Sequence, residues 1–230
     1  MTLERRLARS LSTQAAYTYS HAIDYASGDF GAGVNAYNRR SDRGNADAHV
    51  PHRLVASWTW ALPFRAAGRM NLLLGGWQLN GILSLFNGLP FSVNSATNTL
   101  NNGGGSRASV LPGAKGALPV NQRTIAQWFN IAAFTAPGPQ QFGNTGRNIL
   151  TGPGTAQADV SVFKDFFLSA DQRRRLQFRA ESFNVSNTPQ FNNPAASIGS
   201  AGVGTISAAG APLTFQRTSR EIQLALKLYF

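Results

Sequence analysis

The chain contains no cysteine, so disulfide bonds, thiolate metal sites and cysteine nucleophiles are all excluded. Charged residues are also scarce: Asp, Glu, Lys and Arg make up 13% of the 230 residues, whereas soluble domains usually contain about a quarter. No run of about 18 apolar residues occurs, which excludes a transmembrane helix. Residues 1–10 lack the apolar segment of a signal peptide. Taken alone, this N-terminus predicts a chain that is not exported.

Acidic residues are the rarer charged class, with 10 against 21 basic ones, and the net charge is +11. A basic chain often binds nucleic acid, but this one shows no basic helix, no RNP-type aromatic motif and no zinc-ligand spacing. Arg173, Arg174 and Arg175 follow a short turn and begin a predicted strand, so they indicate a solvated strand end. We therefore expect no nucleic-acid partner.

The final stretch, residues 220–230, alternates between apolar and polar side chains. Side chains two positions apart lie on the same face of a strand. One face therefore carries Ile222, Leu224, Leu226, Leu228 and Phe230. A soluble sandwich could contain such a strand, but a membrane β-barrel requires this alternation throughout, with apolar side chains toward lipid and polar ones toward the lumen.

Further alternating runs occupy residues 11–24, 49–63, 72–95, 155–168 and 173–187. With the last stretch they predict about six strands, and residues 2–7 resemble the end of a seventh. Gly88 and Pro90 are expected to bend the third run. Each run reaches or exceeds the roughly 9–11 residues that a tilted membrane strand needs.

The connections between these runs alternate in length. Those at residues 25–48, 96–154 and 188–219 are long, and those after the second and fourth runs are short. An up-and-down meander would place every long loop at one end, as outer-membrane barrels do with their extracellular loops, whereas a Greek-key sandwich would scatter them. The sequence thus predicts an all-β, antiparallel, up-and-down transmembrane β-barrel segment with long extracellular loops and short periplasmic turns.

One helix is expected within the longest loop. Ile125, Trp128, Phe129 and Ala132 keep helical spacing, which predicts a short amphipathic helix packed on the loop or on the barrel mouth beneath it.

The sequence contains no convincing motif for a catalytic, metal-binding or phosphate-binding site. His49 and His52 form an H-x-x-H pattern without a third ligand, which is more typical of two solvated histidines than of a metal site. The glycines between Gly143 and Gly154 lack the Lys-Ser/Thr of a phosphate loop and indicate turns. The sequence predicts no catalytic residue, cofactor or metal, and no enzymatic activity.

Two further groups of residues leave alternatives open. Asp159, Asp165 and Glu181 lie on predicted polar faces beside Arg179 and Lys164. They could line a substrate path, although lumen-facing charge pairing is the interpretation we favour. Four aromatic residues could form interfacial girdles or simply occupy lipid-facing positions: Trp58, Trp60, Trp77 and Tyr229.

Several motifs, taken in order, resemble the C-terminal barrel strands of Oar-like TonB-dependent outer-membrane receptors. They are H-R-L-V-A-S-W-T-W-A-L-P-F (52–64), G-G-W-Q-L-N-G-I-L-S-L-F-N-G-L-P-F (75–91), F-G-N-T-G-R-N (142–148), G-P-G (152–154), D-V-S-V-F-K-D-F (159–166), L-Q-F-R-A-E-S-F-N-V-S-N-T-P-Q-F (176–191) and the final I-Q-L-A-L-K-L-Y-F. Ser182 and Ser186 depart from the family, which usually has large apolar residues at these positions. The resemblance covers nearly the whole chain.

The resemblance implies that residues 1–230 are the C-terminal part of a receptor barrel, with no counterpart of the signal peptide, the plug or the TonB box. Six strands are too few to close a barrel, and open edges in lipid would leave backbone groups unpaired. The expected function is outer-membrane transport. An adhesive or structural barrel and a soluble all-β binding module remain alternatives, and the substrate is unknown.

The resemblance also implies partners. They are outer-membrane lipid, the barrel assembly machinery and, through the plug that is lacking here, the TonB system. The apolar positions of the last strand, Ile222, Leu224, Leu226, Leu228 and Phe230, resemble the signal that the assembly machinery reads.

Overall fold

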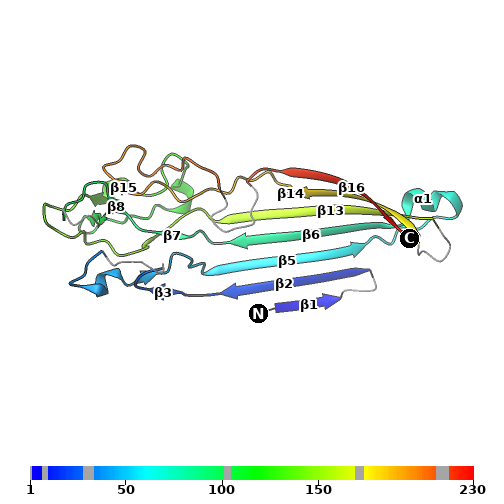
Figure 1. Ribbon diagram of the computed structural model, residues 1–230, viewed down its shortest axis with the longest axis horizontal. Coiled ribbons are helices and arrows are strands. Elements are labelled where there is room, and N and C mark those ends of the chain that lie inside the picture. The colour runs from blue at the N-terminus through cyan, green and yellow to red at the C-terminus, as the bar shows by residue number, and fades with distance from the viewer. Residues whose placement is uncertain (1, 7–9, 28–33, 101–104, 169–173, 211–217) are drawn as a thin grey trace.

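The computed structural model describes residues 2–6, 10–27, 34–100, 105–168, 174–210 and 218–230, and its main feature is one seven-stranded antiparallel sheet (Figure 1). The order β1-β2-β5-β6-β13-β14-β16 follows the chain, so the sheet is an up-and-down meander. The predicted fold class is confirmed, and the seventh strand is present. Because β1 and β16 form the edges, the described strands make an open sheet. The strands are β1 Thr2–Arg6, β2 Leu11–Tyr19, β5 His52–Ala61, β6 Trp77–Phe86, β13 Thr155–Phe167, β14 Arg175–Phe183 and β16 Glu221–Tyr229.

The register of the strands gives the sheet one apolar and one polar face. Residues directly opposite each other in an antiparallel pair share a face, and the pairing aligns apolar with apolar positions from β2 to β16. The apolar face includes Leu54, Trp60, Leu79, Leu83, Val160, Val162, Phe178, Leu224 and Leu226. The polar face includes Ser57, Thr59, Asn80, Asp159, Ser161, Gln177, Arg179, Glu181 and Gln223.

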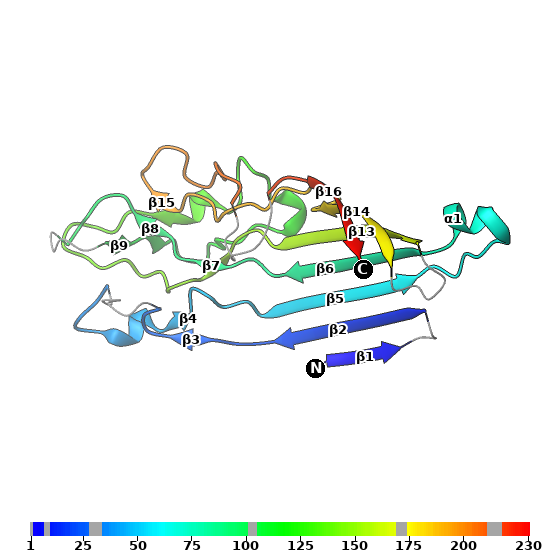
Figure 2. The same ribbon diagram turned by 45° about the vertical axis from the view of Figure 1, so that its right-hand side comes forward.

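The three long connections emerge at one end of this sheet and contain the small strands (Figure 2). The first long loop, residues 20–51, contains β3 Ile23–Asp24, the 3-10 helix η1 Arg39–Asp42 and β4 Gly44–Asn45. The third, residues 184–220, contains β15 Ser197–Ile198. The second, residues 87–154, contains β7 Pro90–Phe91, β8 Asn94–Ser95, β9 Ser106–Arg107, β10 Ser109–Val110, η3 Val120–Gln122, η4 Ile131–Ala133, β11 Phe134–Thr135 and β12 Leu150–Thr151.

The third predicted run is wrong at its start, because Leu72 is helical. Residues before β6 form η2 Gly68–Met70 and the single helical turn α1 Asn71–Leu74, in which the Gly75 amide donates to the Asn71 carbonyl. At the other end the expected bend is confirmed, since β6 stops at Phe86 and the chain leaves the main sheet. A Cβ on Gly88 would lie 2.0 Å from the Gly152 carbonyl oxygen, so only glycine permits this close approach.

All buried hydrophobic side chains among the described residues lie in the second and third long loops. The Phe129 ring stands 5.8 Å from both Phe91 and Phe134, measured between ring centroids. In contrast, Leu226 on the apolar face of the sheet is 64% exposed. The chain thus covers its loop core and leaves the apolar face of its sheet uncovered. The remaining core residues are Val93, Ala108, Ala133, Leu150 and Ile206.

The predicted helix over residues 125–132 is wrong. The Trp128 amide donates to the Gly204 carbonyl, and Phe129 forms a β-bridge with Ala117. These contacts with distant segments replace the local hydrogen bonds of a helix, so tertiary packing overrides the helical spacing. Nowhere in the described part of the chain is a helix both long and apolar enough to cross a bilayer.

Candidate functional site

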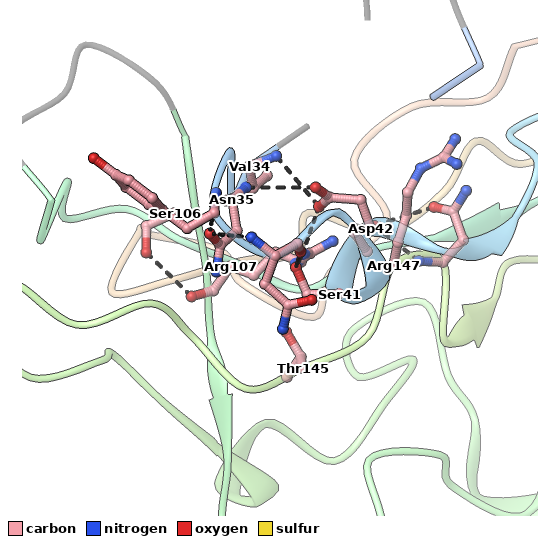
Figure 3. Close-up of polar contacts among 12 residues, drawn as sticks. Val34, Asn35, Ser41, Asp42, Ser106, Arg107, Thr145 and Arg147 are labelled. Carbon is pink, nitrogen blue, oxygen red and sulfur yellow. Dashed lines mark hydrogen bonds and ion pairs between the residues drawn. The ribbon is translucent and has the colours of Figure 1, made fainter. Parts of the chain in front are cut away.

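The first and second long loops are joined by a buried ion pair. Arg107 of β9 donates from Nη2 to Oδ1 of Asp42 at 2.7 Å, and both side chains are only 4% exposed (Figure 3). The Asp42 carboxylate also accepts hydrogen bonds from the backbone amides of Val34 and Asn35. Arg107 thus neutralises an otherwise buried charge, and Asp42 organises the first long loop around it.

Arg147 forms a second connection between the same loops, close to their base. Its guanidinium donates to Asp24, to Asp47 at 2.8 Å and to the Ser27 hydroxyl. The hydrogen bond from Ser27, and then that from Arg147, lowers the pKa of Asp24, against the opposing effect of burial. Beside it, Asn148 adopts a φ of 52° and donates to the Asn45 carbonyl and to Asp47.

The third long loop is joined to the second by a strand pairing and a hydrogen bond. β15 pairs with β8 in parallel, and Asn193 donates to the Pro90 carbonyl at 3.3 Å. Close glycine contacts support this packing: a Cβ on Gly152 would meet Asn193 at 1.9 Å. The glycines of residues 143–154 therefore serve tight packing and turns, as predicted. We call the three long loops together the loop assembly.

Below the loop assembly, the polar face of the sheet carries a hydrogen-bonded network. Gln177 donates to Asp165 at 2.8 Å, and Arg179 donates to both Gln177 and the Tyr229 hydroxyl. Arg175 lies 3.9 Å from Asp165. Charge pairing therefore accounts for Asp165 within the described residues.

A hollow of about 430 Å³ lies on the polar face between β5 and β14. Two carboxylates, Asp159 and Glu181, line it together with Ser57, Thr59, Asn80 and Ser161. The Asn80 Nδ2 is buried without a hydrogen-bond partner in the described structure, which leaves a donor for a polar ligand or water. Asp159 itself accepts from Gln157 and from the Asn184 amide.

The three carboxylates thus do not form one cluster, and Lys164 is not beside them. The register places Lys164 opposite Trp77 and Phe178, on the apolar face. The prediction that Lys164 accompanies Asp159 and Asp165 is wrong because it lies one position out of phase with both.

The two histidines of the H-x-x-H pattern point to different partners. His52 contacts the Tyr17 hydroxyl at 2.7 Å, whereas His49 accepts a hydrogen bond from the Ala22 amide and lies 5.2 Å from His21 between ring centroids. No group of three potential metal ligands occurs among the described residues. Sequence reasoning missed the pairing of His21 with His49.

His49 gives the first long loop a predicted pH dependence. Burial, and then repulsion from His21, lowers the pKa of His49 below its ordinary value of 6.5. Folding disfavours protonation of His49, so its contribution to the stability of the loop is complete at pH values above the pKa that His49 has in the unfolded chain. This contribution is lost as the pH falls through the pKa that His49 has in the folded loop. We expect protease cleavage in residues 20–51 to increase on acidification. His49→Gln should remove most of this increase, whereas an unchanged increase would contradict the role of His49.

Three of the four candidate girdle aromatics lie on the apolar face. Trp60 is 39% exposed there, Trp58 lies over Gly81, and the Trp77 indole donates to the Leu73 carbonyl. Tyr229 lies on the polar face instead, opposite Arg175, and so does not belong to a lipid-facing girdle. Ser182 lies on the apolar face as expected, whereas Ser186 follows the end of β14.

The residues of the suggested assembly signal extend along the free edge of the sheet. Ile222, Leu224, Leu226 and Leu228 occupy the apolar face of β16 and are 59–69% exposed. Phe230 follows the strand and is 99% exposed. This placement leaves all five side chains available to a partner, and their role stays a prediction.

A two-faced antiparallel meander, uncovered on its apolar side and carrying long loops at one end, is the architecture of an outer-membrane barrel wall. The chain matches the family model described as "Outer membrane beta barrel domain" over residues 1–223. It therefore belongs to the outer-membrane β-barrel family and is located in the outer membrane. A search of curated proteins and a search of solved structures each returned no match. In such barrels the apolar face contacts lipid and the polar face contacts the interior.

Proposed function

We propose that the chain forms part of the wall and the outer loops of a TonB-dependent receptor resembling the Oar-like group. The observation that carries this proposal is the continuous polar face of the sheet beneath a folded loop assembly. The polar face would line the transport path and the loop assembly would supply the substrate-binding surface. A plug domain would couple the barrel to the TonB system, and no enzymatic step is involved.

An adhesive barrel without transport is the competing function, because the loop assembly has its own hydrophobic core and could bind a partner by itself. The soluble alternative does not apply to a protein of the outer membrane. Transport and adhesion differ in one respect that can be measured: only a TonB-dependent barrel changes the accessibility of its interior with inner-membrane energy.

The proposed topology places the loop assembly outside the cell and α1 in the periplasm. Since the chain has no cysteine, single cysteines can report on each side. Tyr37→Cys, at a position 94% exposed, should react with an impermeant thiol reagent on intact cells. Ala67→Cys, at an exposed position just before η2 in the same connection, should react only after the outer membrane is opened. The reverse pattern would show that the orientation is inverted.

Energy-dependent access is tested at Ser57, which lines the hollow on the polar face. We expect Ser57→Cys to react with external thiol reagents faster in cells with a working TonB system than in cells without it, because movement of the plug would open the interior. The Tyr37→Cys variant is the control and should react equally in both. Equal rates at Ser57 would favour adhesion over transport.

A further inference from the structure

The connection between β5 and β6, residues 62–76, exposes an unusual number of apolar side chains. We call it the α1 turn. Its sequence contains two arginines and no acidic residue, and both Arg65 and Arg69 are exposed. Five apolar side chains in the turn are 45–65% exposed: Phe64, Met70, Leu72, Leu73 and Leu74. A group of exposed apolar side chains beside exposed positive charge is typical of segments that lie in a membrane interface.

Two side chains from the lipid-facing side of the sheet hold this turn. The Trp77 indole donates to the Leu73 carbonyl at 2.8 Å, and the Lys164 ammonium donates to the Gly75 carbonyl. Lys164 is 2% exposed and lies 5.3 Å and 5.2 Å from the ring centroids of Trp77 and Phe166. The α1 turn is therefore continuous with the face that contacts lipid, at the end of the sheet opposite the loop assembly (Figure 1).

We infer that the α1 turn is an interfacial anchor that inserts its leucines among lipid acyl chains and binds anionic phospholipid headgroups through Arg65 and Arg69. Three observations favour lipid over a protein partner. The turn continues the lipid-contacting face, its charge is purely positive, and a Trp and a Lys, residues typical of membrane interfaces, lie at its junction with the sheet. The assignment to the periplasmic leaflet rests on the proposed topology, whereas the binding of lipid does not.

The test uses the protein extracted from the outer membrane and reconstituted in bilayers of phosphatidylethanolamine with phosphatidylglycerol. A fluorophore on Leu73→Cys should be quenched strongly by lipids brominated near the headgroup. The same fluorophore on Tyr37→Cys, in the loop assembly, is the control and should be quenched much less. Only protein that resists protease is measured, so that unfolded variants do not contribute.

Charge dependence is tested with two matched pairs of substitutions. A basic residue near an anionic surface favours the bound state by about fivefold, so Arg65→Gln with Arg69→Gln should reduce the bound fraction of the turn. Arg40→Gln with Arg43→Gln, which removes two exposed arginines from the first long loop, should have no effect. Bilayers without phosphatidylglycerol should reproduce the loss in the protein with all its arginines.

Several results would overturn the inference. Equal quenching at Leu73 and Tyr37 would show that the turn does not enter the bilayer. Unchanged quenching after Arg65→Gln with Arg69→Gln would show that anionic headgroups do not contribute to the binding. If the probe on Leu73 responds to added periplasmic extract and not to lipid, the turn binds a protein. Loss of energy-dependent access at Ser57 with normal quenching would contradict the transport proposal alone.

Discussion

Replacing Asp42 with alanine is expected to separate the first long loop from the second. The substitution leaves the Arg107 guanidinium buried without its counter-charge, and breaking such a pair typically costs about 3–5 kcal/mol. It also removes the acceptor for the amides of Val34 and Asn35. Hydrogen exchange measured by mass spectrometry should show lost protection in residues 34–45 and 105–110, with the strands of the main sheet unchanged.

Two variants control this experiment. Asp47→Ala removes a carboxylate that is 69% exposed, and Arg147 keeps its ion pair with Asp24, so the loss of protection should be much smaller than in Asp42→Ala. Asp42→Leu combined with Arg107→Met replaces the buried pair with apolar side chains of similar size, so protection should return in residues 105–110. The amides of Val34 and Asn35 still lack their acceptor in this variant, so they should stay unprotected. Equal protection in Asp42→Ala and Asp47→Ala would show that the buried pair does not hold the loops together.

The second large effect is expected from deleting Phe230, the residue after β16, and concerns the amount of protein that the barrel assembly machinery folds. Deleting Phe230 removes a side chain whose burial would stabilise the folded protein by only about 1.5–3 kcal/mol. Leu226→Lys places a charge on the lipid-contacting face, opposite Phe178, and should cost about 2–4 kcal/mol near the bilayer centre. If stability alone determined the amount of folded protein, Leu226→Lys would reduce that amount at least as much as the Phe230 deletion. We expect the Phe230 deletion to reduce the amount of folded protein more, because we propose that Phe230 is read during assembly.

Folded yield and resistance to unfolding separate these two explanations. Protein lacking Phe230 that does assemble should resist denaturant almost normally, whereas assembled Leu226→Lys should not. Gln223→Lys is the matched control, since it adds the same charge to the polar face of β16, opposite Glu181. Equal folded yields of the unaltered protein and the Phe230 deletion would refute an assembly signal.

The sequence by itself determined the two-faced sheet, because the side-chain period of a strand is a local property of the backbone. Residues 220–230 display that period without any partner strand, and every predicted run corresponds to a strand of the meander. Gly88 likewise predicted the bend after β6, because the identity of a residue without a Cβ can be read directly from the sequence. The alternation of long and short connections then determined which end of the sheet carries the loop assembly.

Only the tertiary structure decided how the long loops are built. Asp42 and Arg107 are 65 positions apart, and no periodicity links them. They meet because the strands deliver both loops to one end, where burial makes an unpaired charge costly. The same packing placed Phe129 in the core of the loop assembly and prevented the helix that the spacing of residues 125–132 predicted. Local pattern thus specified the sheet, whereas contacts that depend on the folded sheet specified the loop assembly.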